Sequence, residues 1–64
     1  MEEYRAYGDH DGTQVVALVT DLAAFINEPP ESDIVVYITQ NQEESPTHVR
    51  KGDIFWDRIE NIRG

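Results

Sequence analysis

The stretch TQVVALVTDLAAFINE, residues 13–28, decides the fold, because two structural periodicities compete within it. Its apolar side chains recur at the spacing of one face of an α-helix. They are Val15, Leu18, Val19, Leu22 and Ile26. Asp11 stands before them as an N-cap, Gln14 completes an approximate capping box, and Pro29-Pro30 stops the helix. The spacing therefore predicts one long helix over residues 13–28.

The same residues also fit a β-hairpin followed by a short helix. Val15, Val16, Val19 and Thr20 are β-branched, and residues 13–20 could pair with residues 4–7 across the Asp-His-Asp-Gly turn. Thr20 would then cap a shorter helix over residues 21–27. We expect the long helix, because periodicity over the whole segment is a stronger signal than β-propensity.

The remaining segments read mainly as short strands. Residues 4–7 form a brief aromatic strand, and residues 33–40 form a strand rich in β-branched side chains. After a polar loop at 41–47, residues 48–56 return as a strand that Lys51-Gly52 interrupts with a turn or bulge.

The C-terminal segment is open to two interpretations. Phe55, Ile59 and Ile62 stand at helical spacing with Asp53 placed to cap, so a short helix and a strand are both compatible. In either case we expect an α+β fold in a single domain over residues 1–64. One principal helix packs on a small, mainly antiparallel sheet of three to four strands.

Charge is the most informative property of the composition. Thirteen acidic residues oppose five basic ones, which gives a net charge of −8 on 64 residues. No Lys or Arg occurs within residues 6–49, whereas eight carboxylates do. They are Asp9, Asp11, Asp21, Glu28, Glu31, Asp33, Glu43 and Glu44. Such a surface repels nucleic acid and anionic lipid and attracts basic protein surfaces.

Several classes of function lack the residues they need. The Asp9-His10-Asp11-Gly12 turn does not continue into a calcium loop, and two histidines without cysteine do not make a structural zinc site. His10 and His48 have no nucleophile in a signature context, and no glycine-rich phosphate loop occurs. We expect no enzymatic activity, metal or cofactor.

The chain is also expected to be cytoplasmic. No apolar run is long enough to span a membrane, and the acidic N-terminus does not resemble a signal peptide.

The charge pattern favours a binding protein that imitates nucleic acid. Asp21 and Glu28 would lie two turns apart on one helix face, about 10.5 Å by helical rise. Asp9, Asp11, Glu31 and Asp33 would cluster in the loops at the helix ends. In size and charge pattern the chain is similar to the small acidic inhibitors of phages and mobile elements. These mimic nucleic acid to block a host or defence enzyme. The resemblance implies a basic partner such as a nucleic-acid-binding protein or a nuclease complex, without direct binding of nucleic acid.

Two other interpretations stay open. The chain could be an assembly module, of an immunity, antitoxin-like or structural kind, that binds through Trp56, Phe55 and an apolar strand edge. A homodimer would be one way for so short a chain to bury more apolar surface. Alternatively, the acidity could be an adaptation to salt in a protein of unrelated function.

Overall fold

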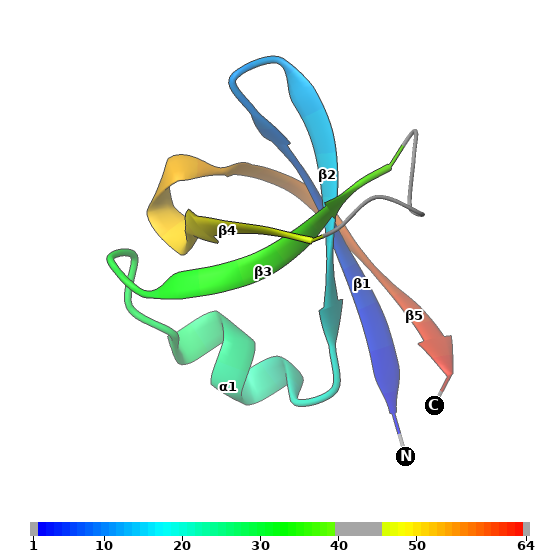
Figure 1. Ribbon diagram of the computed structural model, residues 1–64. Coiled ribbons are helices and arrows are strands. Elements are labelled where there is room, and N and C mark those ends of the chain that lie inside the picture. The colour runs from blue at the N-terminus through cyan, green and yellow to red at the C-terminus, as the bar shows by residue number, and fades with distance from the viewer. Residues whose placement is uncertain (1, 40–45, 64) are drawn as a thin grey trace.

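The computed structural model describes residues 2–39 and 46–63, which form a five-stranded antiparallel sheet with one short α-helix (Figure 1). The strands are β1 (Glu3–His10), β2 (Thr13–Val19), β3 (Asp33–Ile38), β4 (Thr47–Arg50) and β5 (Phe55–Arg63). Helix α1 (Leu22–Asn27) joins β2 to β3, and a 3-10 turn, η1 (Lys51–Asp53), joins β4 to β5. The order across the sheet is β4-β3-β2-β1-β5, so the last strand returns beside the first. No helix in these residues is long and apolar enough to cross a membrane.

The predicted α+β fold with a principal helix is wrong, because most of the predicted helix is strand β2. This strand pairs antiparallel with β1 from Tyr4 opposite Val19 to His10 opposite Thr13. Asp11 and Gly12, at φ 53° and 88°, form the two-residue turn between the strands. The carboxylate of Asp9 closes this turn by accepting a hydrogen bond from the Gly12 N–H at 2.8 Å. Asp11 is therefore a turn residue and not a helix cap.

Burial along β2 shows why the strand prevails over the helix. Val15, Ala17 and Val19 are buried on one face of the sheet, at the spacing of two that a strand imposes, and Val16 is buried on the other face opposite Tyr7 and Tyr37. Leu18, which the helical stripe places at its centre, is 61% exposed. The β-branched side chains thus reach the core from a strand, and an Asp-Gly pair supplies the turn that the hairpin needs.

Helix α1 is the short helix of the alternative interpretation. Its N-cap is Asp21 rather than Thr20, and the Asp21 carboxylate accepts a hydrogen bond from the Ala24 N–H at 3.0 Å. The helix ends at Asn27, before Pro29-Pro30, as the two prolines predict. Leu22 and Phe25 turn its apolar side toward the core.

The second half of the chain completes the sheet. The strand predicted at 33–40 is confirmed over Asp33–Ile38. The returning strand predicted at 48–56 is divided, because η1 separates β4 from β5. The C-terminal segment is a strand, with Asp53 in η1 and Ile59 opposite Ala6 of β1. The predicted polar loop at 41–47 lies mostly outside the described residues, and its last residue, Thr47, begins β4.

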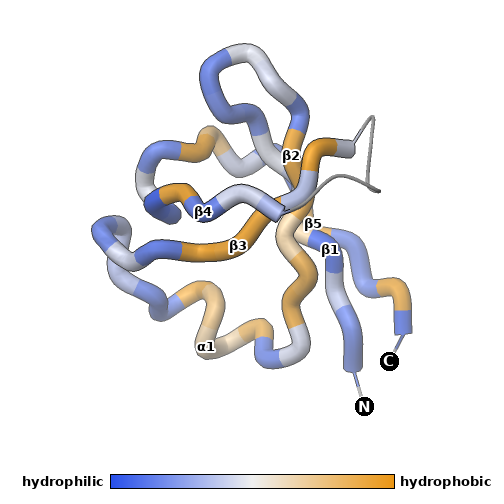
Figure 2. The backbone as a smooth tube through the Cα atoms, viewed as in Figure 1, coloured by the Kyte–Doolittle hydropathy of each residue, from blue (hydrophilic) through white to orange (hydrophobic). Residues whose placement is uncertain are grey.

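The core lies on one face of the sheet, which we call the inner face. Its buried members are Ala6, Val15, Ala17, Val19, Val36 and Ile54. Figure 2 shows apolar segments of β2, β3 and α1 meeting here, while the hairpin tip and the loops are hydrophilic. Trp56 is half-buried against this core, packs edge-on against Phe25 at 5.2 Å between ring centroids, and donates Nε1–H to the Lys51 carbonyl. We call the opposite face of the sheet the outer face.

Gly8 lies where β1 and β5 approach most closely. The pairing of these strands is irregular between Tyr7 and Gly8. Arg58 lies opposite Tyr7 and Trp56 lies opposite Gly8, so Asp57 between them has no partner on β1. The position has no space for a side chain, because a Cβ would meet Ile54 and the backbone of Phe55. In Figure 1, β3 and β4 run across β1, β2 and β5, so the sheet curls around the core.

Candidate functional site

Four carboxylates lie on α1, on the turn after it and on η1, elements that Figure 1 shows near one another. Asp21 and Glu28 cap the two ends of α1, Glu31 lies in the following turn, and Asp53 ends η1. Backbone hydrogen bonds hold the turn against η1, from Gly52 N–H to the Pro30 carbonyl at 2.8 Å and from Lys51 N–H to the Ser32 carbonyl at 2.9 Å. We call Asp21, Glu28, Glu31 and Asp53 the acidic side; all four are exposed.

Lys51, the one lysine of the sequence, lies in η1. Its ammonium group forms hydrogen bonds with backbone carbonyls at the C-terminal end of α1. Its Nζ donates to the carbonyls of Phe25, Ile26 and Glu28 at 2.6, 3.2 and 2.9 Å. The ammonium also lies 5.0 Å from the centroid of the Phe25 ring. A cation at a helix C-terminus satisfies carbonyls that lack a partner and opposes the negative end of the helix dipole. Lys51 therefore stabilises the end of α1 rather than pairing with a carboxylate.

The four arginines are placed elsewhere, on the outer face, where acidic neighbours compensate them. Arg63 is 3.8 Å from Glu3 and Arg58 is 3.3 Å from Glu60, and these are the ion pairs among the described residues. The strand register also sets Arg5 opposite Glu60 and Arg50 opposite Asp33. Exposed pairs of this kind contribute little individually to stability, about 0–1 kcal/mol. Because these arginines lie next to carboxylates, the positive and negative charges of the outer face nearly cancel. The excess negative charge therefore lies in the loops and at the helix ends.

Ile26 is an exposed apolar side chain on the same helix as two of these carboxylates. It lies on α1, whose N-cap is Asp21 and whose C-cap is Glu28, and it is 60% exposed. Protein interfaces combine apolar contacts with polar groups around them. Neither Ile26 nor Asp53 was expected here from sequence. The predicted helix buried Ile26 in its apolar stripe, and Asp53 was assigned to cap a C-terminal helix.

The sequence-predicted site residues do not all come together. Asp9 and Asp11 lie at the β1–β2 turn, separated from α1 by the length of β2, about 23 Å at the usual rise per residue. The expected cluster of these two with Glu31 and Asp33 is therefore absent from the described part of the chain. Asp33 lies on the outer face opposite Arg50, and Trp56 is half-buried. Glu43 and Glu44 lie outside the described residues.

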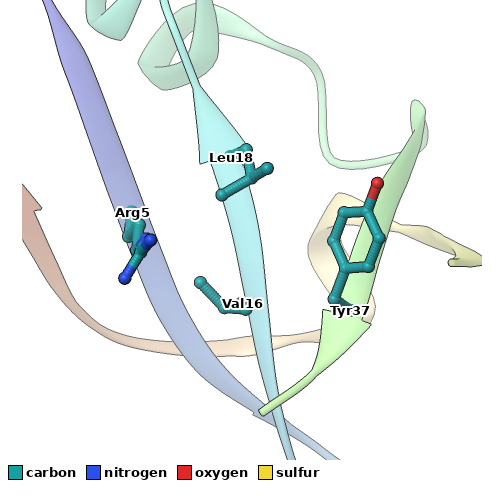
Figure 3. Close-up of a pocket in the computed structure, with 4 residues that line it drawn as sticks. All are labelled: Arg5, Val16, Leu18 and Tyr37. Carbon is teal, nitrogen blue, oxygen red and sulfur yellow. The ribbon is translucent and has the colours of Figure 1, made fainter. Parts of the chain in front are cut away.

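A second surface feature is a shallow hollow on the outer face, about 190 Å³ in volume. Figure 3 shows Arg5, Val16, Leu18 and Tyr37 around it, one from β1, two from β2 and one from β3. A neighbouring hollow of about 310 Å³, at the end of the sheet, shares Arg5 and Leu18 with it. Beside them, the guanidinium of Arg58 stacks 4.3 Å from the centroid of the Tyr7 ring. The lining of the first hollow combines apolar surface with one cation and offers no pair of acid and base.

No group of three or more His, Asp or Glu side chains lies close enough to hold a metal ion in residues 2–39 and 46–63. Tyr4 donates its hydroxyl to Glu2 at 2.8 Å. This hydrogen bond raises the pKa of Tyr4, and desolvation and the charge of Glu2 add to the effect.

Comparison with protein-family models, with curated proteins and with solved structures gives no match.

Proposed function

We propose that this chain is a non-catalytic binding protein that docks on a basic, nucleic-acid-binding surface of a partner protein. The observation that carries the proposal is the placement of charge. The acidic side carries four carboxylates against one nearby cation, because Lys51 donates to the helix carbonyls and the ion pairs of Arg58 and Arg63 lie on the outer face. An uncompensated field of one sign steers a partner of opposite charge and raises the rate of association.

The geometry of α1 supports contact as well as steering. Asp21 and Glu28 are fixed at the two ends of a six-residue helix, so their backbone positions are about 10.5 Å apart by helical rise. Ile26 is exposed on the same helix and can enter an apolar spot on the partner. The Asp21 carboxylate, held by the Ala24 N–H, loses less conformational freedom on binding than a carboxylate on a flexible loop. This arrangement suits a basic cleft that otherwise accepts phosphates.

Two double variants with the same change in net charge test the proposal. Glu28→Gln with Glu31→Gln removes two charges from the acidic side, and Glu2→Gln with Glu3→Gln removes two charges from the N-terminal segment. Both variants change the net charge equally, so general steering is matched. We expect tagged wild-type protein to retain basic nucleic-acid-binding proteins from a host lysate, and duplex DNA to displace them. The first variant should lose this retention and the second should keep it.

Salt provides an independent measurement on the same complex. Charge-driven affinity falls as the Debye length shortens from about 10 Å at 0.1 M salt to about 3 Å at 1 M. Retention that is equal at low and high salt, or equal in the two double variants, would refute docking through the acidic side.

A second candidate function, an assembly module, is favoured by one specific observation. Phe55 is 77% exposed at the start of β5, which is unusual for a large apolar side chain. Trp56 is a weaker candidate for the same role because it packs on Phe25 and bonds to the Lys51 carbonyl. Phe55→Ser separates the two functions, since it should abolish binding by an assembly module and leave salt-sensitive docking unchanged.

A further inference from the structure

Strand β5 presents an open edge of the sheet. It is the last strand in the order β4-β3-β2-β1-β5, so one of its edges has no strand beside it among the described residues. Residues 57–63 are all exposed, and three exposed large apolar side chains lie on this strand: Phe55, Ile59 and Ile62. The other edge strand, β4, is much shorter and runs directly into η1. A long edge with free N–H and C=O groups is a template for a further strand.

We propose that a second copy of the chain pairs with this edge, with the two β5 strands antiparallel about a two-fold axis at Ile59. Two-fold pairing of identical antiparallel strands sets one residue opposite itself and its neighbours opposite each other. With Ile59 on the axis, Arg58 of each copy faces Glu60 of the other. Opposite charges directly across an antiparallel pair are stabilising, and like charges are destabilising.

The charge sequence of β5 selects this register over its neighbours. An axis at Arg58 would place two arginines opposite each other, and an axis at Glu60 or Asp57 would place two carboxylates opposite each other. An axis at Asn61 avoids these clashes, but it shortens the overlap and leaves Arg58 and Glu60 without partners of opposite charge. Pairing about Ile59 also overlaps the whole of β5.

The side-chain contacts and the regular register of β5 around Ile59 favour such pairing. Arg58 and Glu60 already lie on the same face, joined at 3.3 Å, with Arg58 stacked on Tyr7. Residues 58–61 pair regularly with β1 between its two irregularities. Ile59 lies opposite Ala6, which is fully buried, yet it is itself 41% exposed. Ile59 of the second copy would cover this surface, so the inner faces of both copies would join into one larger core.

Complementary charge variants test the register. Arg58→Glu alone creates two Glu–Glu contacts in the dimer, and Glu60→Arg alone creates two Arg–Arg contacts. We expect each to weaken self-association about ten-fold or more in sedimentation equilibrium. An equimolar mixture of the two variants restores two Arg–Glu contacts and should form a heterodimer. A wild-type chain that remains monomeric into the millimolar range, or a mixture no tighter than its components, would overturn the proposal.

Cysteine cross-linking tests the same geometry without altering charge, since the chain contains no cysteine. Paired residues on the axis have Cα atoms about 4.5–5.5 Å apart, within reach of a disulfide, so Ile59→Cys should cross-link under mild oxidation. Phe55 is more exposed, but in this register the two copies of Phe55 lie about 26 Å apart. Phe55→Cys should therefore remain reduced. Equal cross-linking of both variants would refute the register. The acidic side lies on α1 and η1, so this outcome and that of the docking experiment are independent.

Discussion

Replacing Gly8 with alanine tests the close approach of β1 and β5. A Cβ at this position would lie 2.5 Å from Cγ2 of Ile54, 2.9 Å from the carbonyl oxygen of Phe55 and 3.2 Å from Cε3 of Trp56. The Ile54 methyl group can rotate away, but the Phe55 carbonyl moves only if the strand pairing shifts. We therefore expect Gly8→Ala to behave as an overpacked core substitution that lowers the free energy of unfolding by about 1–3 kcal/mol.

The effect should be large because the domain is small. At about 0.05–0.15 kcal/mol per residue, its total stability is on the order of 3–10 kcal/mol. A loss of about 2 kcal/mol would lower the melting temperature by roughly 8–16 °C in a domain of this length. Thermal and urea unfolding followed by circular dichroism would measure both quantities.

Gly12 provides a matched control with a different physical requirement. Its φ is +88° and a Cβ there would meet nothing within 4 Å, so only backbone strain opposes substitution. Asparagine tolerates this backbone region better than alanine does, so Gly12→Asn should be milder than Gly12→Ala. At Gly8 the ranking should reverse, because the larger side chain clashes more. Gly8→Ala within about 0.5 kcal/mol of wild type, or Asn ranking above Ala at Gly8, would refute the close approach.

Substitutions at three further positions, Lys51, Asp21 and Trp56, address the contacts around α1. Lys51→Met removes a donor to three backbone carbonyls and should cost about 1–2 kcal/mol in urea unfolding, whereas Arg50→Met on the outer face should cost less than about 0.5 kcal/mol. Asp21→Ala should lose about 1 kcal/mol of stability with the N-cap, and Asp21→Asn should recover most of it. Trp56→Phe loses the hydrogen bond to the Lys51 carbonyl and should cost about 1–2 kcal/mol, while Trp56→Ala should lose about 3–5 kcal/mol and leave little folded protein by circular dichroism.

Local signals in the sequence predict some elements well. The β-branched run after Pro29-Pro30 predicts β3, and the prolines themselves predict where α1 ends. The Asp11-Gly12 pair predicts a hairpin, but five apolar residues at helical spacing predict a helix over the same segment, and the second prediction is wrong. A helix and a strand can share an apolar pattern over one segment, and only the partner strand decides between them. Here β1 is that partner, and a two-residue turn with positive φ brings it alongside.

The candidate site is harder to predict because it depends on charges that are distant in sequence. The carboxylates of residues 6–49 are visible as a group, yet β2 separates Asp9 and Asp11 from those on α1. The role of Lys51 is invisible to sequence analysis, since it depends on a carbonyl-rich helix end more than twenty residues earlier. The placement of Arg50 opposite Asp33 likewise follows only from the register of β3 and β4.

The position of β1 between β2 and β5 also bears on how fast the molecule can fold. The β1–β2 hairpin closes a short loop and can form in about 1–10 microseconds. The β1–β5 pairing instead brings Glu3 against Arg63, so the chain loses the entropy of closing a very long loop before those contacts stabilise it. Docking of the last strand should therefore limit the folding rate, and the first hairpin should already be formed in the transition state. Destabilising the Asp11-Gly12 turn should slow folding, whereas weakening the far end of β5 should mainly accelerate unfolding.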